Sequence, residues 1–314
     1  MAKEKKDGVL DKLTPDDIEN IILPTLKKDR EKILEQKAKV KKKKNLKTKI
    51  LALSLLFIFM GIGVFSGVKV LAWKVDSDKT YSQIEMIEEN VIIEEVEDTI
   101  ETEIVNPPEE KNTENPYWDY IKMKLINVDF TNLLSINSDT KGWISVNGTN
   151  INYPFVQTVD NEYYLKRDFN KKSNSAGWVY LDYRNNITEL DRNTILYAHG
   201  RLNGTMFGSL KNIFNSDWYN NVNNHVIKLS TLTENTLWQV FSVYHIPTTS
   251  DYLQTEFGSS EEFLTFIQML KDRSQYGFNV EFNENDKILT LSTCYNDQER
   301  VVLHAKLIKR EARQ

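Results

Sequence analysis

The chain has 314 residues, with 40 Lys and Arg, 45 Asp and Glu, 12 Gly and one Cys. This composition excludes a collagen-like chain, a disulfide scaffold and a wholly disordered protein, and a single Cys cannot form an intramolecular disulfide. The formal net charge of −5 hides a strong segregation, because the segments 1–49, 50–75, 76–116 and 117–314 carry +7, +2, −12 and −2. The charge therefore divides the chain into four parts.

Residues 1–49 form a basic tail that is predicted to be largely helical. Thr14, Pro15 and the two acids that follow are typical of a helix start, because a hydroxyl caps the helix and proline suits its first turn. Pro24 is expected to interrupt this helix, and residues 27–44 are expected to form a basic, solvated one. The Lys residues of this helix are interpreted as a signal that sets membrane topology. The alternative interpretation is that they bind the headgroups of anionic membrane lipids.

A membrane span is predicted next. Residues 50–68 contain no charge, and the apolar run continues past Lys69 to Trp73. At about 1.5 Å per residue, this helix is long enough for the roughly 30 Å of a bilayer core. The basic flank predicts a single-pass anchor over 50–73, with the N-terminus cytoplasmic and the rest outside. A cleaved signal peptide is disfavoured, because nearly 50 residues precede the apolar run and no small-x-small site ends it.

Residues 74–116 are acidic and end in Pro107, Pro108 and Pro116. Such a segment repels itself and is stiffened by its prolines, so it is predicted to be a solvated extracellular stalk.

Residues 117–314 are long enough for one sizeable core. Apolar residues at helical spacing predict one or two helices over 117–134 and helices over 206–214 and 260–271. Apolar alternation and the Asn147-Gly148 turn predict eight strands, at 142–146, 149–156, 177–182, 194–199, 226–230, 237–246, 287–293 and 300–309. The fold class is therefore mainly β, an eight-stranded closed barrel with N-terminal helices and a helix before the penultimate strand.

The chemistry-bearing residues lie at strand ends. Cys294 ends one strand, Arg300 opens the next, and an antiparallel pair would place them opposite each other. A guanidinium there would favour a thiolate or stabilise an oxyanion, although a lone Cys is often only a small apolar residue. His199 also ends a strand, whereas His245 and His304 are expected in the barrel wall or core and His225 in a solvated turn. A Cys, a His and an Arg make a nucleophile, an acid–base group and an oxyanion donor, but spacing does not show that they meet.

Metal and cofactor sites are not expected. One Cys and four scattered His show no metal-ligand spacing, and no glycine-rich phosphate loop is present. The slightly acidic outer domain makes nucleic acid an unsuitable partner.

An ordered set of motifs in residues 117–314 resembles the sortases, and their class B branch in particular. The signature is Thr290-Leu291-Ser292-Thr293-Cys294 followed by Arg300-Val301-Val302. The other blocks are Asn193–Gly200, Asn203–Phe207, Asn152–Gln157, Asp160–Leu165, Ala176-Gly177 and Asp182–Asn185.

The resemblance implies a membrane-anchored cysteine transpeptidase of a Gram-positive cell surface. Cys294 would attack the Thr carbonyl of a sorting motif in a secreted protein, His199 would move the proton and Arg300 would hold the oxyanion. An amine of a peptidoglycan precursor, or a pilin Lys, would resolve the thioester. Substrate-binding positions carried over from the family blocks are Asn161, Leu165, Tyr197, Ser292 and, less securely matched, Thr248, Tyr252 and Leu253.

Two departures from the family pattern stand out. The gap from Cys294 to Arg300 is short for the class, and the tail and stalk are long. The alternatives are a pilin-polymerising sortase, a Cys transpeptidase that cross-links peptidoglycan itself, and a membrane-tethered binding module with a degenerate barrel. The intact Cys294, His199 and Arg300 argue against the binding module, and the absence of a Ser-His-Gly-Cys-type string argues against the cross-linking enzyme.

Overall fold

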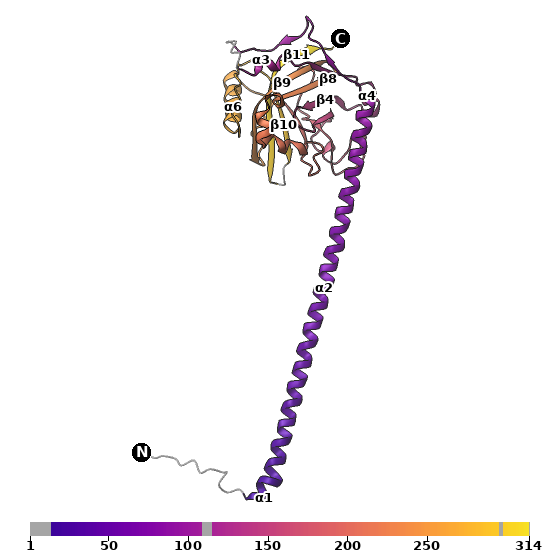
Figure 1. Ribbon diagram of the computed structural model, residues 1–314, viewed down its shortest axis with the longest axis vertical. Coiled ribbons are helices and arrows are strands. Elements are labelled where there is room, and N and C mark those ends of the chain that lie inside the picture. Colours follow the sequence, from indigo (N-terminus) through magenta and orange to yellow (C-terminus); the bar gives the residue numbers. More distant parts are fainter. Residues whose placement is uncertain (1–13, 109–114, 295–297, 314) are drawn as a thin grey trace, which may run out of the picture. The chain divides into compact units, whose positions relative to one another are not determined.

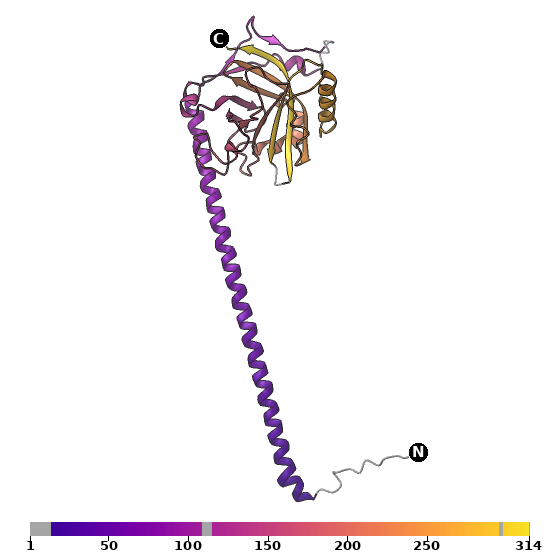
Figure 2. The same cartoon turned by 180° about the vertical axis from the view of Figure 1, so that it is seen from behind.

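A computed structural model describes residues 14–108, 115–294 and 298–313, with the backbone alone described at Ile21 and Cys294 (Figures 1 and 2). Residues 1–13 of the predicted tail and 109–114 of the predicted stalk lie outside these ranges. The chain divides into two units, Met1–Leu71 and Ala72–Gln314.

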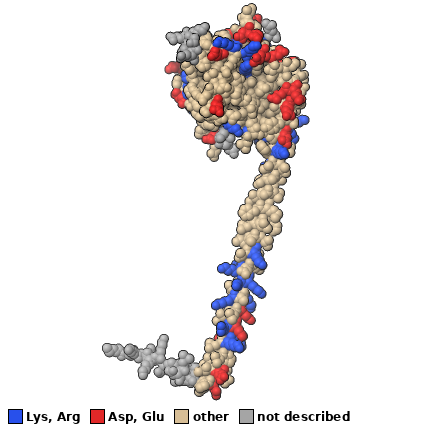
Figure 3. All heavy atoms as spheres, viewed as in Figure 1, with Lys and Arg blue, Asp and Glu red and all other residues tan. Residues whose placement is uncertain are grey.

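The first unit is helical. Helix α1 (Pro15–Asp17) is capped by Thr14 as predicted. The Thr14 hydroxyl accepts a hydrogen bond from the Asp17 backbone N–H, and the Asp17 carboxylate accepts one from the Thr14 backbone N–H. A π-helical turn, η2 (Ile18–Ile22), leads directly into helix α2 (Leu23–Asn90). The predicted interruption at Pro24 is wrong, because Pro24 lies in the first turn of α2, where a proline is tolerated. Among the described residues, one helix is long and apolar enough to cross a membrane. Figure 3 shows Lys and Arg side chains gathered on α2 ahead of its uncharged stretch.

All eight predicted strands of the second unit are present, with modest changes in their ends. They are β4 (Thr140–Val146), β5 (Asn152–Val156), β6 (Tyr180–Leu181), β7 (Asn193–His199), β8 (Val226–Thr231), β9 (Glu234–Pro247), β10 (Ile288–Cys294) and β11 (Glu299–Ala312). The Asn147-Gly148 turn forms with Gly148 at a φ of 70°, but β5 begins only at Asn152.

These strands close into a barrel in the order β10-β7-β6-β5-β4-β8-β9-β11, and β11 pairs with β10 to complete the ring. The pairs β7–β10 and β5–β6 are parallel and the others are antiparallel. The sheet is therefore mixed, and closure removes the exposed edges that an open sheet would leave. Figure 2 shows the long strands β9 and β11 from behind.

The main core cluster is built from large apolar side chains, among them Trp143, Phe155, Trp178 and Trp238, which are almost fully buried. A second cluster lies beneath helix α6 (Ser260–Asp272), where Phe263, Phe266 and Leu270 pack on the outer faces of β9, β10 and β11. The predicted helix before the penultimate strand is confirmed, and Ser259 caps it. The remaining short helices are η3 (Tyr163–Leu165), η4 (Gly208–Phe214), α5 (Ser216–Asn220) and η5 (Val222–Asn224).

The helical prediction over 117–134 is wrong in its middle. Helix α3 (Tyr117–Tyr120) and helix α4 (Thr131–Ile136) flank a strand, β3 (Leu125–Val128). That strand pairs with β1 (Ile93–Val96), about thirty residues earlier, so its backbone partner was not visible in local spacing. The predicted helix over 206–214 is a 3₁₀ helix. It begins only at Gly208, because Met206 has a φ of 54°, outside the helical region.

The acidic segment after the apolar run is structured, although most of its described residues are exposed. Helix α2 continues to Asn90, and Ser77, Thr80, Gln83 and Ile87 are buried. Strand β1 pairs with β3, and the two-residue strand β2 (Glu103–Ile104) pairs with β11. A high net charge predicts a solvated segment only when the segment has no protein surface to pack against. In this part of α2 most acidic side chains are exposed to solvent, while the helix face between them is buried.

Candidate active site

The strand register brings three sequence-predicted residues to one end of the barrel. Strands β7 and β10 are parallel neighbours, and Cys294 is the register partner of His199. Strand β11 runs antiparallel to β10, and Cys294 is also the register partner of Arg300. The predicted antiparallel pairing of Cys294 with Arg300 is confirmed, and the parallel pairing adds His199 on the other side.

Beside these positions lies a cavity of about 550 Å³. All seven positions predicted as substrate-binding line it, together with His199 and Arg300. The seven are Asn161, Leu165, Tyr197, Thr248, Tyr252, Leu253 and Ser292. They come from the loop after β5, from strands β7 and β10 and from the loop between β9 and α6, so only the closed barrel brings them together.

His199 is half-buried, and its ring is held by the loop that follows β5. The His199 Nε2 lies 2.8 Å from the Leu165 carbonyl oxygen. Because a carbonyl oxygen only accepts, Nε2 carries the hydrogen and donates. This hydrogen bond fixes both the ring orientation and the position of one proton.

Gly177 allows this close approach. Its φ is 60°, a left-handed conformation that favours glycine. A Cβ atom at this position would lie 2.5 Å from the Tyr164 carbonyl oxygen and 3.1 Å from His199 Cδ2. The glycine therefore permits the contact between the 164–165 backbone and the histidine ring.

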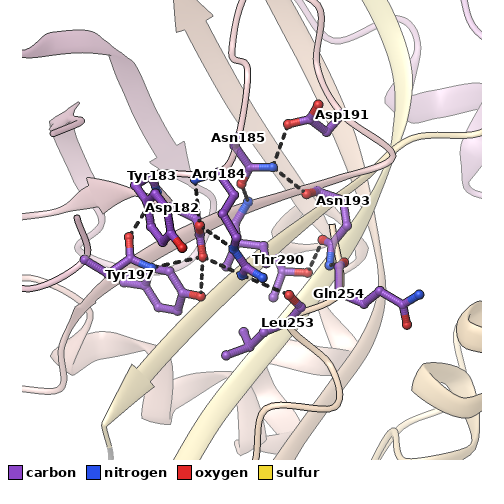
Figure 4. A network of polar contacts seen from close by, with 12 residues as sticks. Asp182, Tyr183, Arg184, Asn185, Asp191, Asn193, Tyr197, Leu253, Gln254 and Thr290 are labelled. Carbon is purple, nitrogen blue, oxygen red and sulfur yellow. Dashed lines mark hydrogen bonds and ion pairs between the residues drawn. The ribbon is translucent and has the colours of Figure 1, made fainter. Parts of the chain in front are cut away.

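A buried carboxylate connects two residues of the cavity wall. Asp182 is fully buried and is hydrogen-bonded by Arg184 and Tyr197 (Figure 4). Asn161 Nδ2 also donates to it. Burial opposes ionisation, but the hydrogen bonds from Arg184 and Tyr197 outweigh it, so the pKa of Asp182 lies below its usual value. Burial, with the adjacent Asp182 charge, raises the pKa of Tyr197, which stays protonated.

A neutral network lies along β10. The Tyr252 hydroxyl is 2.9 Å from Ser292 Oγ, and both residues are buried. Further along the strand, Thr290 Oγ1 is 2.8 Å from His304 Nδ1. Burial lowers the pKa of His304 to about 3, so this histidine is a neutral core residue, as predicted for it.

The other two histidines also differ from His199. His225 is buried against Tyr120, Trp218 and Tyr219, so its prediction as a solvated turn residue is wrong. Burial lowers its pKa. His245 is exposed near the end of β9 and stacks on Phe214, with ring centroids 3.9 Å apart.

Known proteins share this architecture. The family model described as the Sortase domain matches residues 144–308, which is more than half of the chain. The chain belongs to the sortase family. Sortase B of Listeria monocytogenes is 33% identical over 184 residues, which cover 57% of this chain and 74% of that protein.

Solved structures agree with this sortase assignment. A Bacillus anthracis protein described as similar to sortase B shares 40% sequence identity, with a TM-score of 0.53, over 59% of this chain and 83% of that chain. A Staphylococcus aureus sortase B–substrate complex shares 34% identity, with a TM-score of 0.54, over 57% of this chain and 84% of that chain. The chain is thus a class B member of this transpeptidase family, and the predicted sortase barrel is confirmed.

Sequence reasoning missed several residues at the site. Tyr180, Ala198, Thr249, Ser250 and Thr293 also line the cavity. Asp182, Arg184 and Gly177 lie in blocks that resemble the family, but the resemblance assigns them no role. An acid and an arginine two residues apart, directly after a strand, were the available signal for the buried pair.

Proposed function

We propose that the chain is a sortase that cleaves a sorting motif of secreted proteins after Thr and transfers the acyl group to an amine of a peptidoglycan precursor. The observation that carries this proposal is the register in which Cys294 pairs with His199 on one side and Arg300 on the other. The S. aureus relative solved as a substrate complex supports the same reaction class.

The chemistry proceeds in two acyl transfers. The Cys294 thiolate attacks the Thr carbonyl carbon, and the C–N bond breaks as His199 protonates the departing amine. The incoming amine then attacks the thioester, loses a proton to His199 and releases the thiolate. Arg300 donates hydrogen bonds to the oxyanion in both steps. Because Nε2 of His199 is engaged with the Leu165 carbonyl, proton transfer takes place at Nδ1.

The sorting motif lies in the 550 Å³ cavity. Asn161, Tyr197 and Ser292 supply polar contacts, and Leu165 and Leu253 supply apolar ones. Thr248 and Tyr252 border the motif from the loop between β9 and α6.

The chain is anchored by the apolar part of helix α2, with the catalytic unit on the outer face of the cell membrane. The length and apolar composition of that helix and its basic N-terminal flank support this topology. Secreted proteins and lipid-linked wall precursors both reach that face.

A panel of LPxTG-like peptides with hydroxylamine as acceptor tests the reaction. The expected result is cleavage of at least one peptide after Thr, with more hydroxamate than hydrolysed acid among the products. Turnover confined to pilin-type Lys acceptors would favour the pilin-polymerising alternative, and acyl transfer from a peptidoglycan stem peptide would favour the cross-linking one. Binding without any product would leave only the binding module.

Gly177→Ala tests the role of His199. The added Cβ must displace the backbone that holds the ring, so kcat is expected to fall by about 10- to 100-fold. Left-handed strain should also lower the free energy of unfolding by about 1–3 kcal/mol. Gly277→Ala is the matched control, because a Cβ there meets no atom within 4 Å. Equal kcat values for the two variants would contradict the role given to His199.

A further inference from the structure

Asp182 contacts two cavity-lining residues without lining the cavity itself. Its Oδ1 accepts hydrogen bonds from the Arg184 backbone N–H at 3.0 Å and from Nε at 2.9 Å. Its Oδ2 accepts from Arg184 Nη2 at 2.8 Å, Tyr197 Oη at 2.9 Å and Asn161 Nδ2 at 3.1 Å. Figure 4 shows the carboxylate between Arg184 and Tyr197.

This arrangement fixes the direction of the hydrogen bonds. A carboxylate that is hydrogen-bonded by a guanidinium through both of its oxygens is ionised and only accepts hydrogen bonds. The Tyr197 hydroxyl proton therefore points to Asp182. Toward a peptide, Tyr197 therefore offers its oxygen as an acceptor. The Asn161 amide is fixed from both ends, because its Oδ1 accepts from the Tyr183 backbone N–H at 3.0 Å. Its Nδ2 has a second hydrogen to donate.

The same ion pair joins the two sides of the cavity. Arg184 Nη2 also donates to the Leu253 carbonyl oxygen, at 3.0 Å. Leu253 belongs to the loop between β9 and α6, whereas Asn161 belongs to the loop after β5. Arg184 therefore holds the β9–α6 loop at a set distance from the opposite wall.

We propose that Asp182 and Arg184 are positioning residues that set the hydrogen-bond polarity of the sortase groove. The groove then takes a peptide that presents an N–H donor to Tyr197 and a carbonyl to Asn161, and it rejects a carboxylate beside Tyr197. This inference rests on the proposed function, because it assumes that the sorting peptide lies in this cavity.

Asp182→Asn in the full chain tests the proposal. Paired peptides of the LPxTG-like panel differ by Gln against Glu or Asn against Asp at each position, with hydroxylamine as acceptor. An asparagine that turns its Nδ2 toward Tyr197 donates to the hydroxyl instead of accepting from it, so the hydroxyl can reverse. We expect KM for the preferred peptide to rise about tenfold, kcat to change less than threefold, and the preference for amide over carboxylate side chains to fall about tenfold.

Asp191→Asn is the matched control. Asp191 accepts hydrogen bonds from Asn185 Nδ2 and from the Asn186 backbone N–H, and it does not line the cavity. Its replacement should leave KM and the amide preference within twofold of wild type. Unchanged KM and unchanged preference in a folded Asp182→Asn chain would overturn the inference.

Tyr197→Phe covers the case in which Asp182→Asn fails to fold. It removes the acceptor hydroxyl without changing charge, and it should lower the amide preference to a similar extent. A Tyr197→Phe chain with wild-type preference would contradict the inference. Either of these contrary results would overturn the inference alone, because the wild-type chain would still turn over its peptide. If no peptide of the panel gave turnover that depends on Cys294, the proposed function would be overturned, and this inference with it.

Discussion

Replacing Cys294 by alanine is expected to reduce the transpeptidation rate by at least about a thousandfold, because the reaction then has no nucleophile to form the thioester. The chain contains one Cys, so no second thiol can substitute for it. Initial rates of hydroxamate formation, with the best peptide of the panel, measure the effect. The variant should still bind that peptide, since the cavity-lining side chains are unchanged.

A rate for Cys294→Ala within tenfold of wild type would contradict the proposed mechanism. Peptide binding by the variant, measured by calorimetry at the same protein concentration, separates lost chemistry from lost folding. Loss of both rate and binding, with an unfolded circular dichroism spectrum, would call for the same measurements on Cys294→Ser.

Arg300→Lys is expected to lower kcat by about 100-fold while KM changes little. A lysine keeps the positive charge but lacks the planar fork, so it cannot give two directed hydrogen bonds to an oxyanion. Removal of one oxyanion donor costs roughly 10²- to 10³-fold in other acyl-transfer enzymes. Steady-state kinetics over a range of peptide concentrations separate kcat from KM.

Arg310→Lys is the matched control for Arg300→Lys. Arg310 lies on the same strand, β11, and forms an ion pair with Glu234 at 2.6 Å. It does not line the cavity, so its kcat should stay within about twofold of wild type. If Arg300→Lys behaves like Arg310→Lys, Arg300 has no part in stabilising the oxyanion.

The barrel could be predicted because its strand signals are local. Alternation and turn residues mark each strand within a few positions, and all eight strands were found. The failures were non-local. The residues of strand β3 have the apolar spacing of a helix, and their partner β1 lies in a segment whose charge predicts a solvated stalk. Helix α2 packs through Thr80 and Gln83, which carry no apolar signal.

The site was predictable in its members but not in its geometry. Strand-end positions singled out Cys294, His199 and Arg300, and family blocks supplied the seven cavity residues. Their meeting depends on the parallel register of β7 with β10, which joins positions 95 residues apart in sequence. The role suggested for Asp182 likewise depends on a tyrosine from one strand and an amide from a distant loop.

The most direct test of the central claim is the mass of the intact protein after mixing with a cleavable peptide in the absence of acceptor. The intact wild-type protein should gain the mass of the acyl part of the peptide up to Thr and lose it when hydroxylamine is added. Tryptic digestion should locate the added mass on the fragment that contains Cys294. Cys294→Ala should gain no mass under the same conditions. Cleavage of the peptide with no hydroxylamine-sensitive adduct at Cys294 on any timescale from milliseconds to minutes, or an adduct of equal yield in Cys294→Ala, would contradict a Cys294 thioester.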